Sequence, residues 1–266
     1  MSKSIQFATL AQNFDGPGVK AIVLMGSHAR GDAGPYSDVD LVRFVDEQHQ
    51  ELAGVGSHLI DDTLVVVSNV APPETETWFT RPDIAVKTIG GVRCAQILLD
   101  RDETFATLQA RAQAFTWNEN LQGQADRWAS EQMVGWIEEM HKCLEGLHRD
   151  DVGRMLNGLF GGTFGLSQVL QVQRGVLLSG DNGFYAEVAA AIGVDSLWVQ
   201  LRGIAFGVLE VAGRPPSLRA RVAAGLRLYV VTAELLGNAL QPEHAPLIQQ
   251  TVNLINEQLE DLYHDH

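Results

Sequence analysis

Two short motifs near the N-terminus combine residue types that bind phosphate and metal. Gly26 and Ser27 follow an apolar run that ends at Met25, and the pair Asp38 and Asp40 comes some ten residues later. A Gly-Ser turn that opens a helix presents backbone N–H groups, a hydroxyl and the positive end of the helix, which together suit a phosphate. Carboxylates at positions i and i+2 of a strand point to one face and can converge on a divalent cation.

This combination is typical of magnesium-assisted phosphoryl or nucleotidyl transfer. Magnesium takes only one or two protein carboxylates and leaves positions for water and for phosphate oxygens. Each motif alone has an ordinary explanation, since Gly-Ser often only caps a helix and Asp-x-Asp often only faces solvent on a strand. Their order after a buried strand, within about fifteen residues of each other, favours a functional site.

The elements that must position these residues change character along the chain. Short runs rich in apolar and β-branched residues predict strands over 21–25, 39–45, 63–68 and 95–99. The segment 71–91, with three prolines and two adjacent glycines, is expected to be mostly irregular. From about Asp102 onward apolar residues recur at helical spacing, and helices are expected around 152–178, 183–210, 217–240 and 243–263, the first of them interrupted at Gly161-Gly162.

The sequence therefore predicts two domains. Residues 1–115 form an α/β domain with a mixed sheet, and residues 116–266 form an all-α helical bundle. The 266 residues, 45% of them apolar, are sufficient for a substantial core.

Charge and cysteine content exclude several classes of protein. The chain has 33 acidic and 19 basic residues, a net charge of −14, which disfavours nucleic acid as a partner and is compatible with a cationic small-molecule ligand. Two isolated cysteines indicate neither a zinc site nor a disulfide framework. We find no signal peptide and no membrane span in the sequence, so we expect a cytoplasmic protein without a membrane partner.

The segment 19–45 resembles the nucleotidyltransferases related to DNA polymerase beta, whose signature is Gly-Ser, about ten residues, and Asp-x-Asp on a strand. More narrowly, it looks like the aminoglycoside (kanamycin) nucleotidyltransferase branch, and the rest of the chain agrees with that branch in layout. The resemblance implies an enzyme that moves a nucleoside monophosphate from a nucleoside triphosphate, taken to be ATP, to a hydroxyl of a small molecule. The acceptor would be an aminoglycoside-like or other cationic compound, and pyrophosphate would be released.

The resemblance also implies roles for particular residues. Asp38 and Asp40 would ligate Mg²⁺ and be catalytic, while Gly26 and Ser27 would hold the nucleotide phosphates. Ser37 is a further candidate nucleotide contact.

Two positions near this motif leave alternatives open. Arg30 could contact phosphate, or it could only cap its helix and pair with Asp32. Relatives commonly carry a third acid on the next strand, but 63–68 contains none, which leaves Asp62 and Asp100 as stand-ins.

The resemblance to the kanamycin nucleotidyltransferase branch further implies that the general base is a glutamate on the first helix after the sheet, followed one turn later by a lysine near the nucleotide. Glu138 and Lys142 stand at i and i+4, as base and phosphate contact respectively, with Glu139 as the reserve candidate for the base. The same spacing also fits an ordinary solvated ion pair.

Other functions remain open from the sequence. The missing third acid also fits a non-catalytic nucleotide sensor, and an antitoxin-type minimal nucleotidyltransferase that modifies a protein is a further alternative. The sequence does not decide whether the chain forms a homodimer.

Overall fold

The computed structural model describes residues 6–264, which form two compact units. The first unit contains the chain up to Asn118 together with residues 177–184, called here the returning segment, and the second contains 119–176 and the chain from Tyr185 onward. The sequence places the boundary at 115–116 and assigns every later residue to the bundle, so the position of the returning segment differs from that expectation. The residues before and after the returning segment belong to the second unit. A single boundary along the sequence therefore cannot assign this segment to the first unit.

The first unit is built on a mixed five-stranded sheet with the order β3-β4-β2-β1-β5. The strands are β1 (Val19–Met25), β2 (Val39–Val45), β3 (Gly56–Ile60), β4 (Thr63–Val70) and β5 (Gln96–Asp100). Strands β2 and β4 run parallel, while the other neighbouring pairs are antiparallel. The four predicted strands are confirmed as β1, β2, β4 and β5.

Strand β3 was not predicted, because it is a partly exposed edge strand with few apolar residues. It joins β4 through Asp61 and Asp62, whose φ angles are 49° and 65°. Positive φ at both central residues is the geometry of a two-residue hairpin turn that matches the twist of its strands.

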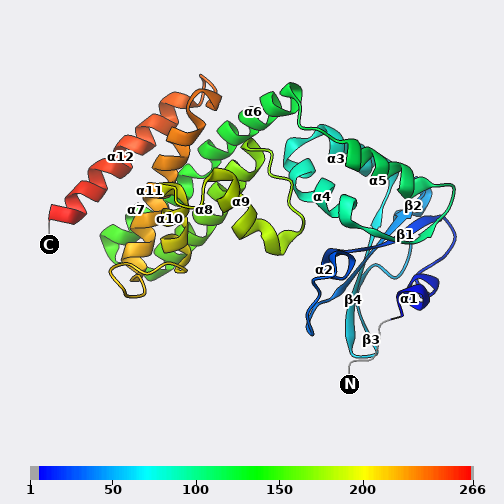
Figure 1. Cartoon of the computed structure of the whole chain (residues 1–266). Coiled ribbons are helices and arrows are strands. Elements are labelled where there is room, and N and C mark those ends of the chain that lie inside the picture. The colour runs from blue at the N-terminus through cyan, green and yellow to red at the C-terminus, as the bar shows by residue number, and fades with distance from the viewer. Residues whose placement is uncertain (1–5, 265–266) are drawn as a thin grey trace. The chain divides into compact units, whose positions relative to one another are not determined.

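Helices cover both faces of the sheet (Figure 1). Side chains alternate along β1, so Ile22 and Leu24 pack with residues of α1 (Phe7–Asn13), while Ala21 and Val23 pack on the opposite face. That second face is covered by α3 (Pro72–Thr80), α4 (Pro82–Cys94) and α5 (Thr104–Ala114).

The expectation that 71–91 is irregular is wrong, because most of this segment forms α3 and α4. Pro72 and Pro82 each occupy the start of a helix, where the missing N–H has no intrahelical acceptor to lose. Gly90 lies within α4 because the backbone of Leu178 packs directly against it, where a Cβ atom would overlap the Leu178 carbonyl. Pro72 and Pro82, which suggested a loop, therefore begin the two helices α3 and α4. Gly90, which also suggested a loop, permits close packing of α4 against Leu178.

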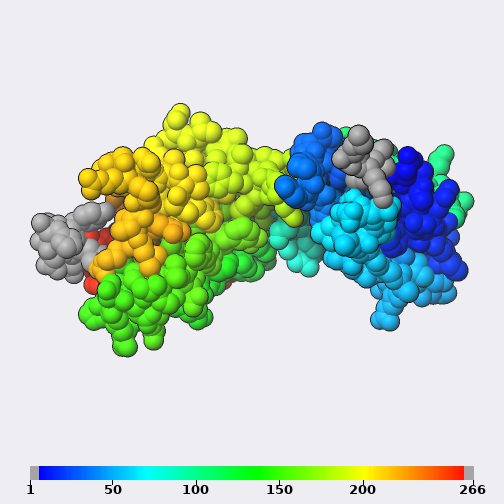
Figure 2. All heavy atoms as spheres, turned by 90° about the horizontal axis from the view of Figure 1, so that it is seen from below, coloured from blue at the N-terminus to red at the C-terminus, as the bar shows by residue number. Residues whose placement is uncertain are grey.

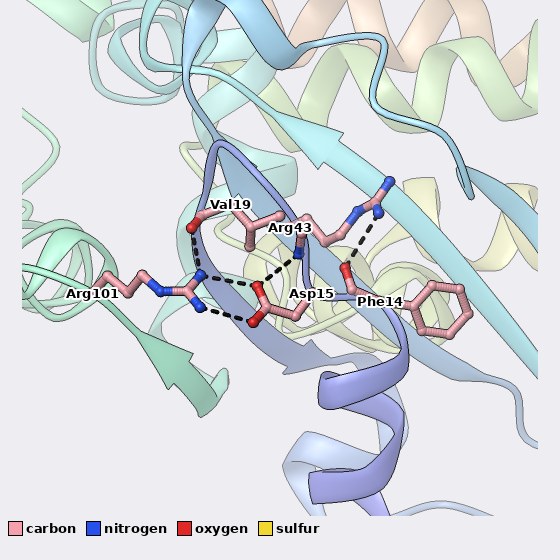
Figure 3. Close-up of polar contacts among 6 residues, drawn as sticks. Phe14, Asp15, Val19, Arg43 and Arg101 are labelled. Atoms are coloured by element: carbon pink, nitrogen blue, oxygen red, sulfur yellow. Dashed lines mark hydrogen bonds and ion pairs between the residues drawn. The ribbon is translucent and has the colours of Figure 1, made fainter.

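Two arginines fix the connection between α1 and β1 (Figure 3). Arg101 donates to both carboxylate oxygens of Asp15, at 2.9 and 2.8 Å, and to the carbonyl of Val19 at 2.7 Å. Arg43 of β2 is 2% exposed and donates to the carbonyl of Phe14 at 3.3 Å. Its other acceptors are Asn69 Oδ1, Leu52 O and Ala53 O. The buried guanidinium thus ties α1, the β2–β3 connection and β4 to the strand that carries Asp40.

The second unit is helical. Its helices are α6 (Glu119–Gly135), α7 (Ile137–Arg149), α8 (Val152–Gln173), α9 (Phe184–Ile192), α10 (Leu197–Phe206), α11 (Leu218–Leu236) and α12 (Ala245–His264). Helix α11 packs against α8, α10 and α7, and Figure 2 shows the green atoms of the α7–α8 pair beside the orange atoms of α11. The predicted fold class, an α/β domain followed by a helical bundle, is confirmed.

Two expectations about the bundle are wrong. Helix α8 continues through Gly161-Gly162 without a break, because its glycines serve helix packing: a Cβ at Gly162 would stand 2.5 Å from Met140 Cε of α7. The expected helix over 183–210 is two helices, since Gly193 takes φ 109° and Ser196 caps α10 by accepting from the amide of Val199. Within residues 6–264 no helix combines the length and apolar character that a bilayer span requires.

Candidate active site

The β1–α2–β2 segment places Gly26 directly beside Asp40. Strand β1 ends at Met25, which pairs in register with Asp40 of β2, and Gly26 begins the five-residue helix α2 (Gly26–Arg30) with φ 66°. A Cβ atom at Gly26 would overlap Asp40 Oδ2. Only glycine allows both this backbone conformation and this close approach.

Asp40 is partly buried and is surrounded by negative charge. Burial raises the pKa of its carboxyl above the ordinary value of 3.8, and the nearby charges of Asp38 and Asp181 raise the pKa further. His28 and Arg30 act in the opposite direction. A partly buried carboxylate whose pKa is raised in spite of nearby cationic groups is typical of a site that receives a further cation.

Two hydrogen bonds between Gly34 and Ser37 close a turn in the loop between α2 and β2. Ser37 Oγ accepts a hydrogen bond from the Gly34 amide at 2.9 Å, and the Ser37 amide donates to the Gly34 carbonyl at 3.1 Å. The turn brings the chain back to β2, so that Asp38 and Asp40 reach the same end of the sheet as Gly26.

Arg30 connects α2 to the returning segment. Its Nε lies 3.3 Å from Asp32 Oδ2, and its Nη1 donates to the Ser179 carbonyl at 3.2 Å. A Cβ at Gly180 would overlap the Arg30 guanidinium. The predicted pairing with Asp32 is therefore present, and it coexists with a contact to a segment about 150 residues away in the sequence.

These groups surround a cavity of about 700 Å³, within the size range of small-molecule sites. Its lining residues are Met25, Gly26, Ser27, Arg30, Gly34, Pro35, Tyr36, Ser37, Asp38, Asp40, Val42, Lys87, Gly91, Ser179, Gly180, Asp181 and Asn182. All of them belong to the first unit. The structure thus brings together the predicted metal and nucleotide contacts of the α/β domain: Gly26, Ser27, Arg30, Ser37, Asp38 and Asp40.

The cavity also contains residues that the sequence did not indicate. Lys87 lies on α4, in the segment expected to be irregular, and Asp181 and Asn182 lie on the returning segment. The run Gly180-Asp-Asn-Gly183 is a break between helices in the sequence, and no local pattern relates it to Asp40. These contributions arise from tertiary contacts alone.

Glu138 and Lys142 lie on α7 in the second unit, so their prediction as base and phosphate contact stays a prediction. Within that unit, Lys142 Nζ lies 2.9 Å from Glu138 Oε1 and 2.8 Å from Glu139 Oε1. Lys142 donates hydrogen bonds to both glutamates, and these bonds, first the one to Glu139 and then the one to Glu138, raise the pKa of Lys142. The side chain of Glu138 is 77% exposed, and that of Glu139 is 20% exposed.

Neither stand-in for the third acid lines the cavity. Both carboxylate oxygens of Asp100 accept backbone amides at the start of α5, from Phe105 at 3.0 Å and Ala106 at 2.9 Å. Asp62 occupies the β3–β4 turn. The residue of β4 that pairs with Asp40 is Val66. The third carboxylate that lines the cavity is instead Asp181.

The donor set fits a magnesium ion held jointly by protein and substrate. Asp38 and Asp40 supply oxygen ligands, and among the side chains that the structure describes, those of residues 6–260, no group of three or more His, Cys, Asp or Glu is arranged to hold an ion. Magnesium usually binds through one or two carboxylates plus substrate phosphates rather than in an all-protein cage.

The chain is similar to a known protein family over its N-terminal part. Its residues 7–94 match the family model described as nucleotidyltransferase domain. No curated protein sequence matches. One similar solved structure is that of a nucleotidyltransferase-like protein from Exiguobacterium sibiricum 255-15, with 11% identity, a TM-score of 0.49, and coverage of 98% of this chain and 81% of that chain. Residues 7–94, which include Gly26, Ser27, Asp38 and Asp40, are thus similar to the nucleotidyltransferase domain family.

Proposed function

We propose that the chain is a Mg²⁺-dependent enzyme that transfers a nucleoside monophosphate from ATP to a hydroxyl of a small molecule and releases pyrophosphate. The observation that carries this proposal is the contact of Gly26 with Asp40 at a cavity that Ser27 and Asp38 also line. Because the Gly26 backbone lies against the Asp40 carboxylate, a triphosphate bound there can accept hydrogen bonds from backbone amides and also contact a cation bound to Asp40.

Different residues of the first unit bind the magnesium ion and the nucleotide phosphates. Asp38 and Asp40 hold the magnesium ion, which supplies neutralisation of the triphosphate charge. Gly26 and Ser27 contact phosphate through amide and hydroxyl donors. Arg30 and Ser37 are the outer nucleotide contacts of the same cavity.

In the reaction, the acceptor oxygen forms a bond to the α-phosphorus while the bond from this phosphorus to the pyrophosphate oxygen breaks. The hydroxyl proton passes to a carboxylate that acts as general base, and we propose Glu138 for this role. General bases of this kind contribute about 10²–10⁴-fold. Glu138→Gln should therefore reduce kcat at least a hundredfold, whereas Glu139→Gln should leave most of the activity. The reverse order would assign the base to Glu139.

We further propose that the acceptor is cationic and of the aminoglycoside type. Asp181 adds a negative charge to a cavity that already contains Asp38 and Asp40, and the whole chain carries −14. An ammonium group of the acceptor would meet Asp181 beside the metal-bound nucleotide.

The experiment is a pyrophosphate-release assay with purified chain, Mg²⁺, labelled ATP, and a panel of aminoglycosides and lincosamides. Turnover with one acceptor, abolished by Asp38→Asn and by Asp40→Asn, supports the proposal. Turnover that survives both substitutions contradicts the metal assignment.

A nucleotide sensor is the second candidate, favoured by Val66 in place of an acid beside Asp40. Mg²⁺-dependent ATP binding without pyrophosphate release from any acceptor would support the sensor. Label that appears on a polypeptide would instead indicate the antitoxin-type activity on a protein.

A further inference from the structure

Lys87 lies on the face of α4 that borders the cavity. One turn later on the same face is Gly91, where a Cβ atom would stand 3.0 Å from Met25 Cε, and both residues line the cavity. Helix α4 therefore passes next to the end of β1, immediately before Gly26. Four residues of helix span about 6 Å, so Lys87 lies farther than Gly91 from the contact with Met25.

The backbone of Lys87 is fixed by packing on both sides. Ala85 and Ile89 are fully buried against the sheet, and the Leu178 amide of the returning segment donates to the Val86 carbonyl at 2.9 Å. The side chain of Lys87 is exposed, while the helix that carries it is held in place. A rigid backbone lets a long side chain act at a defined position.

Lys87 differs from the other lysines of residues 6–264 in having no ion pair there. Lys20 pairs with Asp46 at 3.6 Å, and Lys142 pairs with two glutamates of α7. The other cation that lines the cavity, Arg30, is already held by Asp32 and the Ser179 carbonyl. The ammonium of Lys87 is thus a cationic group at the cavity that no carboxylate of the described chain neutralises.

We propose that Lys87 binds the β- and γ-phosphates of the nucleotide, the part that leaves as pyrophosphate. This inference rests on the proposed function. On the proposed function, Asp38, Asp40 and Gly26 would hold the nucleotide at the end of β1. Lys87, one helical turn from Gly91 on the wall of the same cavity, would then meet the outer phosphates. When the bond to the α-phosphorus breaks, the leaving pyrophosphate gains negative charge, and a fixed ammonium stabilises charge that develops at that place. Lysine is a common phosphate ligand that acts as a point charge.

The test compares affinities for MgATP, MgADP and AMP in the unmodified chain, Lys87→Met, Lys87→Arg and the control Lys20→Met. A lost charge-assisted contact corresponds to about tenfold or more in Kd. We expect Lys87→Met to weaken MgATP and MgADP binding by at least that factor and to leave AMP binding within about twofold. Lys87→Arg should retain most of the affinity, and Lys20→Met should match the unmodified chain. Competition by inorganic pyrophosphate should weaken in parallel in Lys87→Met.

The outcomes separate the two proposals. Unchanged MgATP affinity in Lys87→Met, or an equal loss for AMP, overturns the assignment of Lys87 alone. Absence of any nucleotide binding by the unmodified chain overturns the proposed function and this assignment with it. Thermal unfolding of each variant shows whether the fold is intact, as the exposure of Lys87 leads us to expect.

Discussion

Gly26 and Asp40 lie so close that a Cβ atom on the glycine would overlap a carboxylate oxygen of the aspartate. The backbone at Gly26 also takes φ 66°, a conformation that side-chain-bearing residues adopt at a cost. The end of β1 can therefore lie against the Asp40 carboxylate only because residue 26 has no side chain.

Gly26→Ala and Gly31→Ala should differ in their consequences. Gly31 has φ 82° with open space around its Cβ position, so its replacement measures the cost of positive φ alone, about 1–2 kcal/mol. Gly26→Ala adds displacement of Asp40, and we expect a larger loss in the free energy of unfolding together with loss of Mg²⁺-dependent ATP binding. Chemical denaturation and ATP titration measure both quantities. Equal destabilisation with intact binding would show that the two side chains do not compete for space.

The part of the site within residues 26–40 could be predicted because its geometry is local. One strand, one turn and the next strand fix where Gly26, Ser27, Asp38 and Asp40 meet, and the sequence contains all of them within fifteen residues. Lys87 and Asp181 could not be predicted in this way. Their positions depend on α4 and the returning segment packing together, and no periodicity in the sequence encodes that contact.

The prolines show why part of the fold was also missed. Pro72 and Pro82 suggested a loop, since proline breaks a helix interior, but at the first helical position it is compatible with a helix. The sequence pattern alone does not distinguish these two positions. Strand β3 was missed for a different reason, because its partly exposed edge position removes the apolar pattern.

Asp40→Asn should stabilise the metal-free protein at neutral pH while it abolishes activity. Because burial and then Asp38 and Asp181 raise the pKa of Asp40, the folded chain binds this proton more tightly than the unfolded chain. The carboxyl therefore costs stability once the pH rises above its ordinary value and through the folded-state pKa. We expect a gain of roughly 0.5–2 kcal/mol at pH 7 that disappears below the ordinary pKa near 3.8. Urea denaturation at both pH values measures it, and a less stable variant at pH 7 would refute this sign.

With Mg²⁺ and ATP bound, the unmodified chain should become more stable than Asp40→Asn. A ligand that binds the folded state raises the free energy of unfolding, by about 2.7 kcal/mol at a hundred times its Kd. We expect Mg²⁺ with ATP to raise the Tm of the unmodified chain and to have little effect on Asp38→Asn or Asp40→Asn. The reference is protein treated with EDTA and kept free of added metal. Equal Tm increases in all three proteins would place the cation elsewhere.

Asp181→Asn and Asp62→Asn test which acid serves the cavity. Asp181 lines it and Asp62 does not, although Asp62 precedes the strand where the sequence resemblance led us to expect a third acid. We expect Asp181→Asn to raise the KM for a cationic acceptor about tenfold, the value of one charge-assisted contact, and to change the affinity for MgATP little. Asparagine tolerates the positive φ at position 62, so that variant should behave like the unmodified enzyme. A larger effect from Asp62→Asn would contradict the assignment.

Arg43→Met should destabilise the first unit strongly. It would remove the guanidinium that donates to Phe14 O, Leu52 O, Ala53 O and Asn69 Oδ1, of which Leu52 O alone has a second described donor, Asn69 Nδ2. We expect a loss of roughly 3 kcal/mol or more in chemical denaturation. Arg43→Lys should not restore stability, because one ammonium cannot span the acceptors of a planar guanidinium. Arg154→Met, which removes an exposed contact to Asp151, is the control and should remain within about 0.5 kcal/mol.

The returning segment has a consequence for dividing the protein. A truncated chain that ends at Asn118 would keep the whole sheet but lose Leu178, whose backbone covers Gly90, and Ser179, which accepts from Arg30. Neither half, expressed as a continuous piece, would reproduce the pocket. Proteolytic nicking between α8 and α9 should likewise impair the N-terminal domain first, although the cut lies more than fifty residues beyond its apparent end.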